Sequence, residues 1–145
     1  MAESFSNKVA RAVGIVTSSA AGAIGITTNK ITGISTDGVS LGDLVDNQNY
    51  IAGTSVETIG VGEVVLDRDS TNTSSTTSQS VKFLRPTVVY TSPVGVKSIL
   101  IGGTFANNTN SQVALTVTIL DTSETVHSAI ASKIPVPAGS SFVIS

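Results

Sequence analysis

The sequence predicts an all-β fold of two small antiparallel β modules, preceded by a short N-terminal helix or arm. Apolar residues make up 40% of the 145 residues and are mostly Val, Ile, Leu and Ala, and small β-branched side chains fit pleated sheets better than helix bundles. Short apolar runs are separated by Gly, Asn, Asp and Ser/Thr turns, as in hairpins. Residues 112–120 alternate apolar and polar side chains, which is the strand period.

Residues 4–13, SFSNKVARAV, are the best helix candidate in the chain. Phe5, Val9 and Val13 recur at helical spacing and would form one apolar face. Because ten residues do not hold a helix alone in water, this segment must dock, either on its own domain or on a neighbouring subunit. We therefore treat residues 1–13 as a helix or arm, and Phe5, Val9 and Val13 as candidate assembly residues.

Residues 14–69 form the first predicted β module. Three short apolar runs separated by the turn sequences SSAAG and TN are expected to be strands, at 14–17, 23–27 and 30–34. Residues 35–46 are expected to form a turn and one helical turn. Two further strands, 54–59 and 63–66, would be joined around Gly60-Val61-Gly62 as a hairpin.

Residues 67–80, DRDSTNTSSTTSQS, contain no apolar side chain. Such a run buries no surface that could offset the entropy of ordering it. The sequence therefore predicts a Ser/Thr-rich linker, assigned to residues 70–80, between the two modules.

Residues 81–145 form the second module, which is expected to be a β-sandwich. Asn107–Ser111 is a clear turn, because Asn tolerates left-handed backbone and caps itself with its side chain. The strand at 112–120 is predicted to be half buried and antiparallel to a strand at 97–105. Shorter strands are expected at 81–84, 87–90, 125–130 and 141–144, with an extended edge segment at 134–137.

The composition leaves little material for catalysis. Of the 145 residues, 40 are Ser or Thr, none is Cys, and His127 is the only histidine. Charged residues make up 12% and are scattered, and the net charge is -2, so there is no clustered basic patch for nucleic acid. The sequence contains no run of about 20 apolar residues, so it predicts no membrane-spanning helix. We expect no enzyme, no cofactor and no metal.

The motifs that resemble sites fail in detail. A calcium loop starting at Asp67-Arg68-Asp69 would need Gly and Glu where Asn72 and Ser78 stand. Gly22–Gly25 and Gly60–Gly62 lack the Lys and the long helix that phosphate and dinucleotide loops need. The sequence contains no G-x-S-x-G nucleophile elbow with which His127 could form a catalytic triad.

The aromatic residues leave two alternatives open. Phe83, Arg85 and Tyr90 could form a stacking platform for a nucleic acid or a sugar, and Tyr50 and Phe105 could also supply a sugar platform. The simpler interpretation is core aromatics with a surface arginine.

Two parts of the chain resemble bacteriophage structural proteins. Residues 31–71 carry I-T-G-I-S-T, the Gly38 and Gly42 spacing, G-T-S-V and I-G-V-G, and resemble a small β module found repeatedly in those proteins. Residues 98–121 and 133–145, with an Asn/Thr turn and the P-V-P-x-G approach to the last strand, look like a phage virion β-sandwich module.

The resemblance implies a virion location, and a non-enzymatic structural component such as a capsid decoration, a neck or collar protein or a tail appendage. It implies no catalytic residues. The expected partners are further copies of the chain and other virion proteins. The alternative is a carbohydrate-binding module of a tail fibre that recognises a glycan on the host surface. The sequence does not choose the position in the particle or the number of copies.

Overall fold

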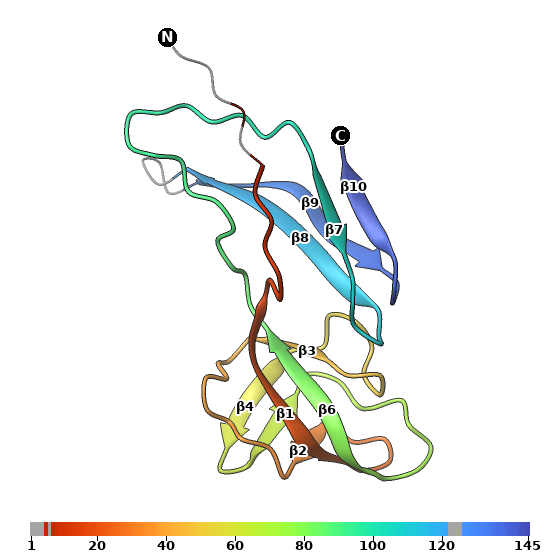
Figure 1. Cartoon of the computed structure of the whole chain (residues 1–145). Helices are drawn as coiled ribbons and strands as arrows, with labels where there is room; N and C mark the ends of the chain where they lie inside the picture. Colours follow the sequence, from red (N-terminus) through yellow and green to blue (C-terminus); the bar gives the residue numbers. More distant parts are fainter. Residues whose placement is uncertain (1–4, 6, 122–125) are drawn as a thin grey trace.

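A computed structural model of the chain describes residues 5, 7–121 and 126–145. Within these residues the fold is all-β and antiparallel, as predicted, and contains no helix (Figure 1). The strands are β1 Ile15–Ile24, β2 Lys30–Thr32, β3 Leu44–Asp46, β4 Val56–Gly60, β5 Glu63–Leu66, β6 Thr76–Leu84, β7 Gly103–Ala106, β8 Val113–Asp121, β9 Val126–Val136 and β10 Ser141–Ile144.

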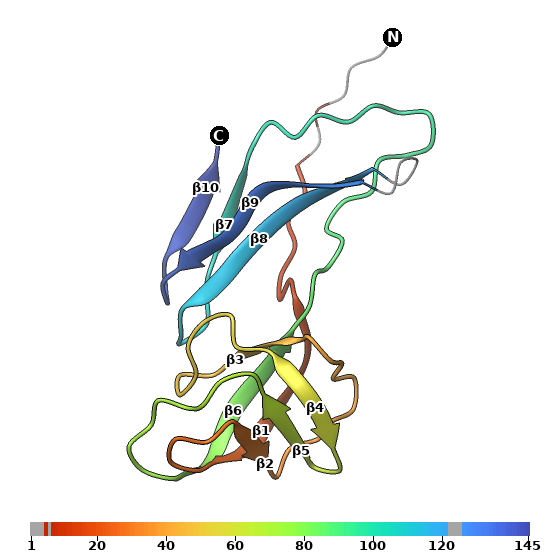
Figure 2. The same ribbon diagram turned by 180° about the vertical axis from the view of Figure 1, so that it is seen from behind.

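The first six strands form one sheet that closes on itself. Their order is β3-β6-β1-β2-β5-β4, and the two outer members meet through a bridge between Leu44 and Ser55. Val45 N donates to Thr54 O at 2.9 Å, and Val56 N donates to Asp43 O at 2.9 Å. Figures 1 and 2 show the resulting small barrel at one end of the molecule. The closure covers the start of β4 at Val56, and the rest of β4 pairs only with β5 among the described strands.

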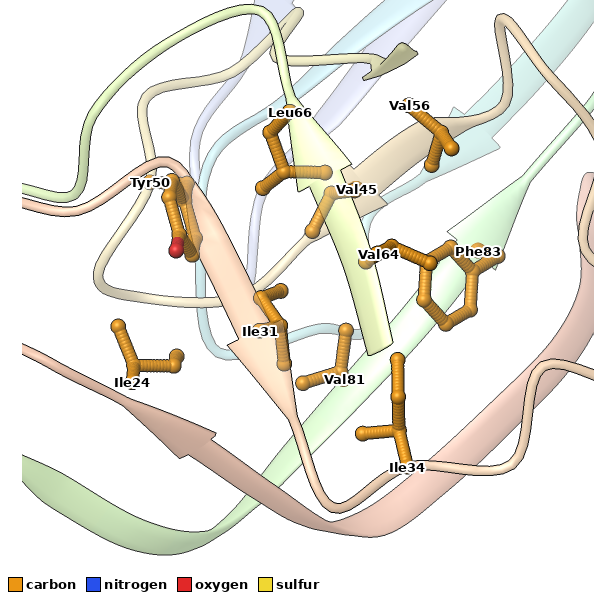
Figure 3. Close-up of a cluster of buried hydrophobic side chains, with 10 residues drawn as sticks. All are labelled: Ile24, Ile31, Ile34, Val45, Tyr50, Val56, Val64, Leu66, Val81 and Phe83. Carbon is orange, nitrogen blue, oxygen red and sulfur yellow. The ribbon is translucent and has the colours of Figure 1, made fainter. Parts of the chain in front are cut away.

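The barrel holds the well-packed core of the protein. Its largest fully buried side chains include Phe83, Ile24, Ile31 and Leu66, and Figure 3 shows them directed toward one another from β1, β2, β5 and β6. The cluster also contains Ile34, Val45, Tyr50, Val56, Val64 and Val81. Buried positions alternate with less buried ones in β2, β5 and the second half of β6, so that one face of each of these strands turns inward.

The pair of β1 and β6 is the longest in the barrel, and it corrects two predictions. Residues 18–22, predicted as a turn between strands, continue β1 through register shifts on both sides of Gly22. A Cβ on Gly22 would lie 2.8 Å from Val81 Cγ2, so only glycine permits this close approach. Residues 76–80, predicted as linker, form the first half of β6 because their backbone pairs with β1.

Of two other predictions for the barrel, one is confirmed and one is wrong. The hairpin around Gly60-Val61-Gly62 is confirmed as β4 and β5. The helical turn expected within 35–46 is wrong, because Leu44–Asp46 is the short strand β3, paired with β6. Pairing with a long neighbouring strand has overridden a weak local preference.

The C-terminal part forms two separate two-stranded ribbons, β7 with β10 and β8 with β9, which lie side by side above the barrel in Figures 1 and 2. The alternating strand is present as β8, and the turn at Asn107–Ser111 precedes it. Its predicted partner is wrong, because β8 pairs with β9. Residues 97–102 and the expected strand at 87–90 lie outside every strand.

The predicted N-terminal helix is not seen. Residues 7–10 have no regular structure, and residues 11–14 form a bend and a turn that lead into β1. Three apolar residues at helical spacing do not stabilise a helix unless the face that they form is buried, and this face is not buried. Residues 1–4 and 6 of the predicted helix or arm lie outside the described residues.

Candidate assembly surface

Residues 86–102, here called the connecting segment, expose an unusual density of apolar side chains between the barrel and β7. Their exposed fractions reach 75% for Val88, 104% for Val94, 87% for Ile99 and 73% for Ile101. Val89, Tyr90, Val96 and Leu100 are also about half exposed or more. Scattered exposed apolar residues are ordinary on protein surfaces, but a contiguous run of them marks an interaction site.

The backbone of this segment is also unpaired. Among the backbone amides of residues 86–101, only that of Val96 donates to a backbone carbonyl in the described part of the chain, to Pro93 O at 3.1 Å. Side-chain contacts shape the segment locally: Ser92 Oγ donates to Val96 O at 2.7 Å and lies 2.8 Å from Ser98 Oγ. Valine- and isoleucine-rich backbone of this kind is well suited to strand pairing.

The ribbons also expose apolar side chains. Ile119 and Leu120 of β8, Ile130 of β9 and Val143 of β10 are each 42–58% exposed. Among the described apolar residues of the C-terminal part, only Ala131 and Val136 are buried. The ribbons therefore have very little core of their own, in contrast to the barrel.

The N-terminal arm leaves the barrel beside the connecting segment. Arg85 N donates to Gly14 O at 2.8 Å, and both segments then extend toward the end of the molecule that carries the ribbons (Figures 1 and 2). Phe5 is 82% exposed, Val9 83% and Val13 48%. The structure does not gather them on a helical face, and their role in assembly stays a prediction.

One buried asparagine holds the ends of the two ribbons together. Asn107 is 4% exposed, and its Nδ2 donates to Val136 O, Ser111 O and Pro137 O at 2.8, 2.9 and 3.2 Å. Its Oδ1 accepts from the amide and hydroxyl of Thr109. This side chain links the turn before β8 to the end of β9. It therefore holds the two ribbons in place relative to each other, although the ribbons bury few apolar side chains.

An ion pair between half-exposed Arg85 and the buried Asp43 fixes the point where the connecting segment begins. Arg85 Nε and Nη2 donate to the Asp43 carboxylate at 2.7 and 2.8 Å, and the Asp43 side chain is 2% exposed. Burial would raise the pKa of Asp43, but hydrogen bonds from Arg85 and the Ser40 amide, with the Arg85 charge, lower it below 3.8. The exit of the chain from β6 is thereby anchored to the barrel.

A second polar contact joins the barrel to the ribbons. Ser111 Oγ, in the turn before β8, donates to Asp46 Oδ1 in β3. Lys82 Nζ lies 3.7 Å from the other oxygen of the same carboxylate. These groups line a small hollow with Asn110, and the contact is polar, so it does not cover the exposed apolar side chains.

Two of the three residues of the predicted stacking platform make other contacts in the structure. Phe83 is fully buried in the core, and Arg85 is committed to Asp43. Tyr50 is 5% exposed and donates its hydroxyl to Thr28 O at 3.1 Å; burial, with the charge of Asp69, raises its pKa to about 12. Tyr90 is 45% exposed, and the Arg85 side chain is 40% exposed although it is paired with Asp43.

The other motifs hold ordinary structural positions. Asp67 Oδ1 accepts from the Ser55 amide at 2.7 Å, which joins the end of β5 to the loop before β4. No cluster of three potential metal ligands occurs within the described residues. The backbone of His127 pairs with that of Leu120, and its side chain lies outside the described part. In that part there is also no helix of the length and apolarity that a bilayer span requires.

Sequence reasoning missed the unpaired state of the connecting segment and the Asp43–Arg85 pair. Alternation of polar and apolar residues identifies a strand but not its partner. An ion pair formed across 42 residues leaves no local signal.

Comparison with known proteins finds no relative of this chain. No family model, no curated protein and no solved structure matches the chain.

Proposed function

We propose that this chain is a non-enzymatic structural component of a phage virion, a capsid decoration, neck or collar protein or tail appendage. The observation that carries the proposal is the contrast between a closed, well-packed barrel and a C-terminal part whose apolar side chains stay exposed. A protein that works in isolation normally buries such a surface. A protein that functions as a repeated part of a larger assembly buries it against its neighbours.

The virion location rests on the resemblance of residues 31–71, 98–121 and 133–145 to phage structural modules. The Asn/Thr turn that contributes to it is built around the buried Asn107 side chain, so a precise turn supports this part of the pattern. Many modest contacts between repeated copies add up through multivalency, and this suits a surface rich in Ser, Thr and Asn.

Electron cryomicroscopy of intact particles tests this function. The expected result is density for the barrel at symmetry-related positions on the head, neck or tail. Particles that contain the chain at no fixed position, or purified virions that lack it, would contradict the proposal. A particle produced without the gene for this chain is the matched control.

A second candidate is a carbohydrate-binding module, and it is favoured by the surroundings of Tyr90. Its ring is partly exposed, and its hydroxyl lies 2.9 Å from Ser98 Oγ, with Ser92 Oγ nearby. Sugar sites combine an aromatic surface with polar groups in this way. Saturable binding on a glycan array that is lost in Tyr90→Ala would support this candidate. Tyr50→Ala is not a suitable test, because Tyr50 belongs to the core.

A further inference from the structure

The accessible surface of the chain is too large for a compact monomer. The chain exposes 9,695 Å² at a mass of 14.7 kDa, whereas a compact monomer of that mass exposes about 6,900 Å². If the nine undescribed residues are allowed the full surface of an unfolded chain, about 1,400 Å², an excess of roughly 1,400 Å² remains. An obligate interface between two proteins buries about 2,000–5,000 Å² in total. The excess of two copies falls in that range.

The unpaired part of the connecting segment lies directly upstream of a strand. The ladder between β7 and β10 runs from Ala106 to Gly103, where Gly103 pairs with Ile144. Residues 97–102, KSILIG, continue the chain of β7 toward its N-terminal side and pair with no strand among the described residues. Gly102 alone lies against the end of β10, where a Cβ on it would be 2.7 Å from Ile144 O. Ile99 and Ile101 are two residues apart, so an extended backbone would present both on one face.

We propose that residues 97–102 pair as a β-strand with a second copy of this chain, and that the apolar residues of the connecting segment and the ribbons form the interface. The inference deepens the proposed structural role and rests on it. Strand addition gives affinity through main-chain hydrogen bonds and specificity through alternate side chains. Each subunit would gain the contacts that its ribbons lack, so that the sandwich expected for this module is completed between copies.

A second copy explains this surface better than a charged ligand would. Lys97 is the only charged residue of the connecting segment, so the segment offers little electrostatic complementarity to an ionic partner. Self-association also controls an exposed strand, because an unpaired apolar strand otherwise promotes aggregation. A closed assembly satisfies the strand in a fixed number of copies.

Three full-length proteins test the proposal: the natural chain, Ile99→Glu with Ile101→Glu, and Val61→Glu as the control. Val61 is 104% exposed at the tip of the β4–β5 hairpin, so Val61→Glu adds a charge at an exposed apolar site far along the chain from the interface. Mass is measured by analytical ultracentrifugation over a range of concentrations. Hydrogen exchange is measured at the amides of residues 97–102, and the amides of β6 report whether the barrel is intact.

The natural chain and Val61→Glu are expected to form one discrete oligomer with at least tenfold slower exchange at residues 97–102 than in the double variant. The double variant is expected to be a monomer that keeps protection in β6. A monomeric natural chain, protection of 97–102 within a monomer, open-ended aggregates, or an oligomer that survives the double substitution would each overturn the proposal. None of these outcomes refutes a virion role, which is decided by the presence of the chain in particles.

Discussion

Arg85 binds the buried Asp43 carboxylate with two nitrogens, Nε at 2.7 Å and Nη2 at 2.8 Å, and thereby joins the end of β6 to the loop before β3. Arg85 Nη2 also donates to Gly38 O at 3.1 Å. A planar guanidinium can make this two-point contact with a carboxylate, whereas a lysine ammonium cannot. The pair fixes the residue from which the connecting segment departs, so it connects barrel stability with presentation of the assembly surface.

We expect Asp43→Ala to lower the free energy of unfolding by about 2 kcal/mol, because it removes charge-assisted hydrogen bonds from Arg85 and the Ser40 amide. Arg85→Ala should also destabilise the protein, since it leaves the carboxylate buried without its cation. Urea denaturation followed by circular dichroism measures both.

Arg68→Ala is the matched control, because Arg68 lies 3.8 Å from Asp67 in a much more exposed pair. It should change the free energy of unfolding by less than about 0.5 kcal/mol. Equal effects of Arg68→Ala and Arg85→Ala would show that the Asp43 pair has no special role.

The same pair predicts a loss of stability in acid. The folded protein holds the pKa of Asp43 below its ordinary value of 3.8, so the unfolded chain binds a proton first as the pH falls. The contribution of Asp43 is present above about pH 4 and is lost as the pH drops through the folded pKa. Urea midpoints at a series of pH values should show a smaller decline below pH 4 in Asp43→Asn than in the natural chain. Parallel declines in the two proteins would reject this assignment.

Tyr50 predicts a second loss of stability, in alkali. Burial, with the charge of Asp69, raises its pKa in the folded state to about 12 from 10.0. Between these values the unfolded chain loses the tyrosine proton and the folded chain keeps it, so stability falls as the pH rises above about 10. Tyr50→Phe should remove this part of the pH dependence. The variant also loses the bond to Thr28 O, at a cost of about 1 kcal/mol that is independent of pH below 10.

Gly22 tests the close approach of β1 to β6. A Cβ at this position would lie 2.8 Å from Val81 Cγ2 and 3.2 Å from Gln79 O. Gly22→Ala should therefore lower the free energy of unfolding by about 1–3 kcal/mol, as overpacking does. Ala20→Ser, at an exposed position of the same strand, should have an effect within about 0.5 kcal/mol. A neutral Gly22→Ala in urea denaturation would mean that the bulge shifts easily to admit a methyl group.

The sequence predicts some elements of this fold well and others badly, for identifiable reasons. β8 was predictable because Val113, Leu115 and Val117 follow the strand period, and the turn before it because Asn107 is a turn former. The first half of β6 was not, because Thr76–Ser80 has no apolar side chain. Its strand structure comes from backbone pairing with β1, and that pairing depends on a partner about 55 residues away.

The residues of the candidate assembly surface also divide into features that the sequence predicts and features that it does not. Phe5, Val9 and Val13 were proposed from helical spacing, yet the described arm is not helical. The sequence predicts strands at 87–90 and 97–105 and pairs the second with 112–120, whereas residues 87–90 and 97–102 lie outside every strand of the described residues. Whether such a strand finds its partner in the same chain or in another copy depends on register and geometry, and a single sequence does not record either one.

The N-terminal arm carries two apolar side chains, Phe5 and Val9, that are more than four-fifths exposed. Removing residues 1–13 should leave the barrel intact, because its first strand begins at Ile15. Since Arg85 N donates to Gly14 O, the arm starts beside the connecting segment and is well placed to contact the same neighbour. The truncated chain should therefore dissociate at a higher concentration than the natural chain, and it should bind less well to particles that lack the protein. Lys8→Ala is a control that keeps the apolar side chains of the arm. If the truncated chain keeps both its oligomer mass and its attachment, residues 1–13 make no contact outside their own subunit.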